Sequence, residues 1–418
     1  MNARVTTDSE SGVGRFEEAT AEGQVIGPLV VGTIAHGGHC IARYEGRVVF
    51  VRHAIPGETV MVRITDAQHD RYWRGDAVEI IEAAPGRVSP PCPLAGKCGG
   101  CDFQHIALET QRGLKTTVVR ELLHHFAQLD SDVIVEPVGD DDTGLGWRTR
   151  MRYGVDDHTV GLHRHRSSEL VALAPEGCLI AEQAGRDPQR LEALALQTDS
   201  DELIVATAPS GVSVVEAGRS SKGHPALVDE RALSGEAIVT EQVGGHSFRA
   251  RADGFWQPHR MAPDVLTAQV LRVLAPRPGE RALDLYCGVG VFAAALTDAG
   301  CRVRGIEMNG PAIHLARANV PGAQFIAGRV DRVLARGRNK ADLVVLDPPR
   351  AGAGKGAVEQ IARLRPRKVA YVACDPAALA RDLASFARHH YRVSDIKAFD
   401  LFPMTHHVEC VALLEPDE

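Results

Sequence analysis

The 418-residue sequence has no long hydrophobic run. None approaches the roughly 18 to 20 apolar residues that a membrane-spanning helix needs, which excludes an integral membrane protein. Aromatic residues make up only 5%, and positive charge is not in excess: 47 Lys and Arg against 54 Asp and Glu leave a net charge of −7. The balance gives no general sign of nucleic-acid binding, although local basic patches can still bind phosphate.

The N-terminus lacks the apolar core of a signal peptide. Residues 1–23 are rich in Glu, Ser, Thr and Gly, so we expect a disordered leader on a cytoplasmic protein. Nine cysteines are too few for a disulfide scaffold in a chain of this length.

Three of these cysteines nevertheless lie close together. Cys92, Cys98 and Cys101 follow one another in a loop rich in Pro and Gly, a pattern that indicates a metal site in a reducing compartment. A tetrahedral site needs a fourth thiol, and Cys178 is the best-placed candidate. Zinc and an iron–sulfur cluster both accept four thiolates, so the spacing alone does not distinguish them.

The length predicts two to three domains at roughly 150 residues each. Residues 24–85 contain short β-rich runs separated by turns, which predicts a small closed β-barrel. Residues 86–255 form a central, mostly β domain with the cysteine cluster and a helix over about 105–130, which we expect to pack on the catalytic domain. In residues 256–418, strands alternate with helices, the pattern of a doubly wound, Rossmann-like α/β domain.

The last domain carries a nucleotide-type binding motif. Asp284–Gly290 follows a predicted strand, and its glycines allow close approach of a ligand at a helix start. Glu307 ends the next strand, where an acidic residue binds ribose hydroxyls in this fold class. Because the third glycine of the dinucleotide fingerprint is missing, the motif favours S-adenosylmethionine over NAD. Asp347, at the end of the fourth strand in Asp347-Pro348-Pro349-Arg350, should border the same crevice.

A nucleophile and a base can be proposed beside this motif. Cys374 ends the fifth strand just before a helix, where we expect the helix start to assist thiolate formation. A thiolate that adds to C6 of uracil makes C5 nucleophilic enough to take a methyl group, and a base must then remove the C5 proton. Glu409, just before the last strand, is the candidate base. We expect the neighbouring His406 and His407 to be a solvated pair.

These motifs resemble those of the uracil-C5 RNA methyltransferases, which make 5-methyluridine in transfer and ribosomal RNA. The resemblance rests on Gly254–Gln257, Asp284–Gly290, Asp347–Arg350 with Cys374–Pro376, and Phe402–Glu409. The N-terminal barrel resembles a TRAM domain, an RNA-binding barrel of oligonucleotide-binding type. The resemblance implies Cys374 as nucleophile and Glu409 as proton acceptor. It also implies four residues that bind S-adenosylmethionine: Gln257, Tyr286, Glu307 and Asp347.

The ribosomal-RNA branch of this family carries the same cysteine spacing and binds a [4Fe–4S] cluster. The resemblance therefore implies such a cluster at Cys92, Cys98, Cys101 and Cys178, and ribosomal RNA as substrate, with transfer RNA as the alternative. We expect a monomer. The chain departs from the family's Ser-Cys-Asn-Pro at Ala373-Cys374-Asp375-Pro376, and has Pro258-His259 after Gln257. Asp375 would oppose thiolate formation if it were unpaired.

Two other functions are less consistent with the residues. Cytosine-C5 methylation normally uses a cysteine after the fourth strand, and Asp347–Arg350 contains none. A non-catalytic RNA-binding protein would not need Cys374 and Glu409. For the RNA itself, phosphate contacts are expected at basic residues of the central domain, chiefly Arg148, Arg150, Arg152, Arg164 and Arg166.

Overall fold

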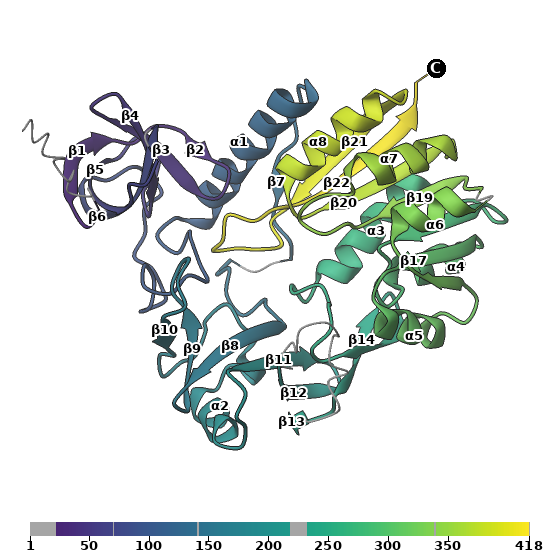
Figure 1. The fold of residues 1–418 in the computed structure, drawn as a ribbon, viewed down its shortest axis with the longest axis horizontal. Helices are drawn as coiled ribbons and strands as arrows, with labels where there is room; N and C mark the ends of the chain where they lie inside the picture. Colours follow the sequence, from purple (N-terminus) through teal and green to yellow (C-terminus); the bar gives the residue numbers. More distant parts are fainter. Residues whose placement is uncertain (1–21, 70, 140–141, 218–231, 338–339, 418) are drawn as a thin grey trace, which may run out of the picture. The chain divides into compact units, whose positions relative to one another are not determined.

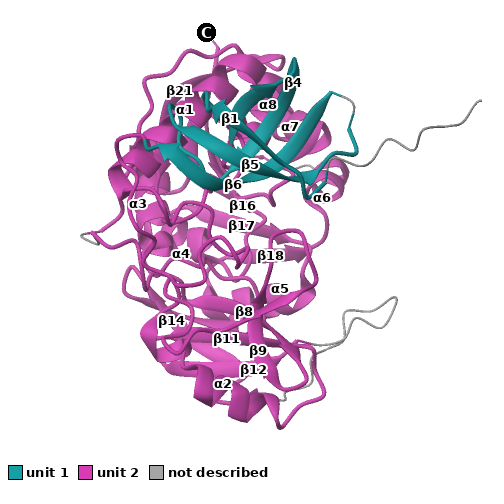
Figure 2. Ribbon diagram, turned by 90° about the vertical axis from the view of Figure 1, so that its left-hand side faces the viewer, with its two compact units in different colours: residues 1–33, 40–83 teal, residues 34–39, 84–418 magenta. Residues whose placement is uncertain are grey.

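The structure, a computed structural model, describes residues 22–69, 71–139, 142–217, 232–337 and 340–417 (Figure 1). Nearly all of the expected leader, residues 1–23, lies outside this part of the chain. The chain forms two compact units: residues 1–33 with 40–83, and residues 34–39 with 84–418 (Figure 2). Over the described ranges, no helix combines the length and the hydrophobicity that crossing a membrane requires.

The first unit is built from one mixed β-sheet, in which only β4 and β6 pair in parallel among the strands described. Its strands are β1 (Val25–Val30), β3 (His39–Tyr44), β4 (Arg47–Arg52), β5 (Thr59–Asp66) and β6 (Tyr72–Glu82), which pair in the order β1-β5-β6-β4-β3. Alternate residues of β5, Val60, Val62 and Ile64, are buried, as a strand with one face on a core requires. The short strand β2 (Ile34–Ala35) belongs to the second unit by its contacts.

The central part of the second unit is mostly β, as predicted. Its antiparallel sheet has the order β10-β9-β8-β11-β12-β13 and is covered by α2 (Pro188–Ala195). Tyr153, Leu191 and Val205 lie in its core. A separate hairpin, β14 (Ile238–Val243) and β15 (His246–Arg251), leads to the catalytic domain. The bounds of the six sheet strands are Arg150–Asp156 (β8), Thr159–His163 (β9), Leu170–Ala172 (β10), Glu202–Ala208 (β11), Gly211–Glu216 (β12) and Ala232–Ser234 (β13).

The catalytic domain contains an eight-stranded sheet in the order β18-β17-β16-β19-β20-β22-β21-β7. The five strands from β18 to β20 are parallel, and β22 is antiparallel to both of its neighbours. The strand bounds are Arg281–Leu285 (β16), Arg302–Glu307 (β17), Gln324–Ala327 (β18), Leu343–Leu346 (β19), Lys368–Ala373 (β20), Tyr391–Phe399 (β21), Glu409–Pro416 (β22) and Val135–Glu136 (β7).

Helices cover both faces of this sheet, which confirms the doubly wound fold (Figure 1). On one face, Leu343 and Val345 join a core with α3 (Ala262–Leu274), α4 (Val291–Asp298) and α5 (Gly310–Asn319). On the other, Val344 and Leu346 join a core with α6 (Val330–Arg336), α7 (Gly354–Arg363), α8 (Pro376–Ala387) and α1 (Leu108–Ala127). The helix expected over about 105–130 is α1, and it packs against α8.

Candidate active site

The carboxyl ends of adjacent strands bring the predicted catalytic residues to one edge of the sheet. Asp347 directly follows β19, and Cys374 directly follows its neighbour β20. Glu409 reaches the same edge because β22 runs antiparallel to β20, with Cys410 paired to Ala373. The last strand therefore begins where the parallel strands end.

Asp347 and Gln257 are joined across 90 positions of sequence. The side-chain amide of Gln257 donates a hydrogen bond of 3.0 Å to Oδ2 of Asp347. Burial raises the pKa of Asp347 to about 7, although the hydrogen bond from Gln257 acts in the opposite direction. Two of the four predicted donor-binding side chains thus contact each other directly.

Tyr286 and Glu307 lie at the ends of β16 and β17, the next strands of the sheet. Tyr286 adopts a left-handed backbone conformation, with φ of 62°, at the turn that follows β16. Both carboxylate oxygens of Glu307 accept backbone hydrogen bonds, from Gly288 at 3.3 Å and from Asn309 at 2.7 Å. Glu307 is therefore held at the glycine turn of the Asp284–Gly290 motif.

Asp284 has a role that the sequence did not reveal. Its side chain is 1% exposed, and its Oδ2 accepts a 2.9 Å hydrogen bond from the amide of Ala293 in the first turn of α4. Its Oδ1 has no hydrogen-bond partner among the described residues. Burial raises the pKa of Asp284 well above its usual value. Asp284 thus ties the start of α4 to β16 beneath the glycine turn.

Cys374 is half-buried among carboxylates. Burial, followed by the charges of Glu409 and Asp347, raises the pKa of its thiol to about 12, although Arg350 acts in the opposite direction. This differs from the expectation that the start of α8 would favour the thiolate. Desolvation of the thiol and the charges of two nearby carboxylates raise the pKa of Cys374 by more than the N-terminus of α8 could lower it.

Glu409 is the more deeply buried of the two catalytic candidates, with a side chain that is 1% exposed. Burial raises its pKa well above the usual value, and the charge of Asp347 adds to this effect. Its Oε1 has no hydrogen-bond partner within the described ranges. A buried carboxylate with a free oxygen beside a thiol is typical of a reacting group rather than of a solvated surface residue.

Asp375, the departure from the family pattern, is not unpaired. Its Oδ2 lies 3.2 Å from Nε2 of His36, and its Oδ1 accepts a 2.7 Å hydrogen bond from the amide of Ala378 as the N-cap of α8. Burial raises the pKa of Asp375, but the contacts with His36, Ala378 and Arg381 outweigh it and hold the pKa below its usual value. The carboxylate therefore stays charged beside the thiol.

The pair His406 and His407 is not solvated, contrary to the expectation. Nδ1 of His406 lies 2.6 Å from Asp102. Nε2 of His407 accepts a 3.0 Å hydrogen bond from Arg350, and burial lowers the pKa of His407 to about 3. His407 is thus neutral and accepts a hydrogen bond from the guanidinium of Arg350, whose charge lowers the pKa of Cys374.

The four predicted cysteine ligands lie in one region. Cys101 and Cys178 both pack against a small core of Trp147, Ile180 and Met404. Burial raises the pKa of Cys101 above its usual range, and the thiols of Cys178, Cys98 and Cys92 add to this. In the described part of the chain, however, no three His, Cys, Asp or Glu side chains are arranged to hold a metal ion. The donor set is chemically suited to a soft metal centre, but its geometry is not that of a bound site.

Several arginines expected to contact phosphate form internal ion pairs. Arg150 pairs with the buried Glu241, and Arg152 lies 2.5 Å from Glu202. Arg164 lies 2.7 Å from Glu169. Because these guanidinium groups already have carboxylate partners, the central domain offers less free positive charge than the sequence indicated.

Comparisons with known proteins cover almost the whole chain. An RNA methyltransferase of Streptomyces avermitilis is 45% identical over 92% of this chain and 97% of its own length. The 23S rRNA (uracil(1939)-C(5))-methyltransferase RlmD of Shewanella piezotolerans is 30% identical over 93% of this chain and 95% of its own length.

A solved structure and two family profiles also match this chain. The crystal structure of Pyrococcus abyssi tRNA (uracil-54, C5)-methyltransferase with S-adenosyl-L-homocysteine matches the fold with a TM-score of 0.70, over 92% of this chain and 99% of that one, at 24% identity. The tRNA (Uracil-5-)-methyltransferase family profile matches residues 329–417, and the TRAM domain profile matches residues 20–78. The chain therefore belongs to the RNA (uracil-C5)-methyltransferases that carry a TRAM domain.

Proposed function

We propose that this enzyme methylates C5 of a uridine in RNA through a covalent bond between Cys374 and C6 of the base. The observation that carries the proposal is the position of Cys374 beside two buried carboxylates, Glu409 and Asp347, at one edge of the sheet. A cysteine and a buried base next to each other are the two groups that this chemistry needs.

The donor would bind at the ends of β16, β17 and β19. Gln257, Tyr286, Glu307 and Asp347 line this side of the sheet edge, and Glu307 is suited to ribose hydroxyls. S-Adenosylmethionine supplies an electrophilic methyl group on a positive sulfonium, whose charge also favours the thiolate. This positive charge would offset the negative charges of the buried carboxylates Glu409 and Asp347 near Cys374.

The chain's own residues would then act in order. The Sγ thiolate of Cys374 adds to C6, and the electron pair of the C5–C6 double bond becomes available at C5. It forms the new bond to the methyl carbon as the bond between that carbon and the donor's sulfur breaks, and the electron pair of the broken bond stays on the sulfur. Glu409 then accepts the C5 proton. The C5–C6 double bond re-forms as the C6–Sγ bond breaks, and the thiolate leaves. A raised pKa makes the ionised form of Glu409 a stronger base for this proton.

Trapping with 5-fluorouridine tests this proposal. Fluorine at C5 cannot leave as a proton, so RNA containing 5-fluorouridine should form a denaturation-resistant complex with the enzyme when donor is present. Cys374→Ala should form none, whereas Cys301→Ala, which removes a thiol outside the site, should trap as the wild type does. Equal trapping by Cys374→Ala and the wild type would refute the covalent role.

For the RNA, we propose a ribosomal substrate. The named relative RlmD acts on 23S rRNA and is similar over nearly the full length, which favours this choice over transfer RNA. The target base must leave its stack to reach Cys374, so a single-stranded or loop uridine is expected. Nucleoside mass spectrometry of ribosomal and transfer RNA, each incubated with enzyme and donor, would distinguish the two substrates.

We also propose that Cys92, Cys98, Cys101 and Cys178 hold a [4Fe–4S] cluster. The four cysteines lie close enough for their thiolate charges to interact, and four such thiolates form a donor set suited to this cluster. Its proposed contribution is structural, because methyl transfer moves no electrons to it.

A further inference from the structure

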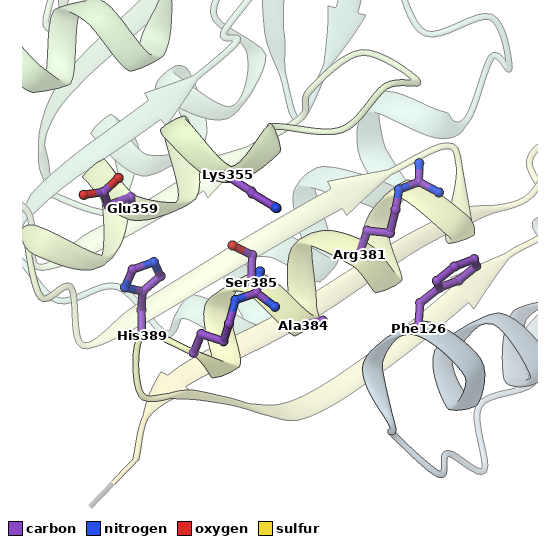
Figure 3. Close-up of a pocket in the computed structure, with 8 residues that line it drawn as sticks. Phe126, Lys355, Glu359, Arg381, Ala384, Ser385 and His389 are labelled. Atoms are coloured by element: carbon purple, nitrogen blue, oxygen red, sulfur yellow. The ribbon is translucent and has the colours of Figure 1, made fainter.

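A groove on the helical face of the catalytic domain carries positive charge that nothing in the mechanism uses. It lies between α7 and α8, with the end of α1 at one side, and has a volume of about 510 Å³. Figure 3 shows Lys355 extending from α7, with Arg381 and Phe126 at one end of the groove and Glu359 and His389 at the other.

The groove is built by helical periodicity. It takes Arg381, Ala384 and Ser385 from α8 and Arg388 from the C-cap of that helix. These residues are spaced i, i+3, i+4 and i+7 and so share one face. The two small side chains leave room between the two arginines, which are about 10 Å apart along the helix axis. The volume falls within the roughly 300 to 1,000 Å³ of common ligand sites.

The charges of this groove are not balanced. Among the described residues that line it, Glu359 is the only carboxylate, and it lies 2.6 Å from Arg363, which does not line the groove. Lys355, Arg381 and Arg388 are all exposed. In the central domain, by contrast, several of the arginines already have carboxylate partners. Three cations gathered on a protein of net charge −7 repel one another, and an anion would relieve that repulsion.

One end of the groove lies toward the N-terminal half of α8, the helix that follows Cys374. Arg381 is near enough to Asp375, the residue after Cys374, to help lower its pKa. At this end, the ring of Phe126 is 39% exposed and lies 5.8 Å from the Arg381 guanidinium. An exposed aromatic ring beside cations is a surface on which a nucleobase can stack while the cations contact phosphates.

We propose that this groove binds the sugar–phosphate backbone of the RNA next to the target uridine, with Lys355, Arg381 and Arg388 as the phosphate contacts. The inference rests on the proposed function, since it takes the flipped uridine at Cys374 as the point from which the strand enters the groove. The groove adds contacts with the bound strand and carries no sequence information of its own.

Salt-dependent binding tests this proposal. The probe is a long oligouridine, bound to the full-length protein over a series of KCl concentrations. In K355Q/R381Q/R388Q, three phosphate contacts are lost, so binding should weaken and the slope of log Kd against log salt should fall by about 2, at roughly 0.7 per contact for a single strand. The charge-preserving K355R/R381K/R388K should keep most of the affinity and the wild-type slope.

The matched control changes the same charge elsewhere. Arg302, Arg304 and Arg392 lie in β17 and β21, outside the groove, and R302Q/R304Q/R392Q should leave the slope close to that of the wild type. A slope in K355Q/R381Q/R388Q equal to that of the wild type or of the control would overturn the proposal. If the slope falls in K355Q/R381Q/R388Q as expected but the wild-type enzyme forms no methylated uridine, the proposed function is refuted and the groove remains an RNA-binding surface.

Discussion

Nδ1 of His406 lies 2.6 Å from the carboxylate of Asp102. This contact joins the loop that carries Cys92, Cys98 and Cys101 to the segment that leads to Glu409. The backbone strengthens the connection, because the amides of Asp102 and Phe103 both donate to the carbonyl of Met404, at 3.0 and 2.9 Å. Asp102 directly follows Cys101. The loop that carries three of the clustered cysteines is therefore part of the support of the catalytic edge.

Asp102→Ala tests this support. Without the carboxylate, His406 loses its partner and the segment before Glu409 should shift, so methyl transfer should slow by roughly ten- to a hundredfold, as misplaced catalytic groups do. Donor affinity, measured by calorimetry, should stay the same because Gln257 and Glu307 lie elsewhere. Asp130→Ala, which removes the partner of the exposed His124, is the control. An unchanged single-turnover rate in Asp102→Ala would show that the contact is not needed for catalysis.

Glu409→Gln should separate methyl transfer from product release. The amide keeps the shape but cannot accept the C5 proton, so the enzyme should accumulate covalent adduct on unmodified RNA. Denaturing gels with labelled RNA would detect it. Glu415→Gln, on the same strand and partly exposed beside Lys368, should turn over normally. Normal turnover of Glu409→Gln without adduct would remove Glu409 from the mechanism.

Asp375→Asn should make Cys374 more reactive at a given pH. After burial and the charges of Glu409 and Asp347, the negative charge of Asp375 also contributes to the raised pKa of Cys374, so removing it should lower that pKa. A lower thiol pKa means more thiolate at lower pH, and the pH curve of alkylation should move down the scale. Asn can still cap α8, so the helix should be kept.

The measurement is the rate at which iodoacetamide modifies the Cys374 peptide, followed by mass spectrometry across pH. Asp331→Asn, which removes a carboxylate paired with the exposed Arg329, is the control and should leave the curve in place. A curve for Asp375→Asn that coincides with that of the wild type would mean that His36 and the helix terminus already cancel the charge.

Anaerobically purified protein should be brown and contain about four irons per chain, as four thiolates around one cluster require. Replacing Cys92, Cys98, Cys101 or Cys178 with Ser should lower the iron content and loosen the central domain, while Cys301→Ser should keep the iron. A colourless preparation with one zinc per chain would exclude the iron–sulfur cluster. Full iron in Cys178→Ser would exclude only that residue as the fourth ligand.

The sequence by itself determined the features that depend on local patterning. Alternating strands and helices predicted the doubly wound sheet, because each buried strand and each amphipathic helix has its own periodicity. Because parallel strands end at one edge of a sheet, the same pattern predicted that Asp347 and Cys374 lie on the same side of the domain. The set of four donor-binding candidates was implied by the resemblance to the methyltransferase family, and two of its members, Gln257 and Asp347, contact each other in the structure.

Only the tertiary structure decided how these groups are charged and supported. Burial of Cys374 among carboxylates raises its pKa, where the helix start alone predicted the opposite. The partner of Asp375 is His36, and that of His406 is Asp102, each hundreds of residues away in the sequence. A pKa depends on the water and the charges that surround a group, and these come from distant segments that no local pattern specifies.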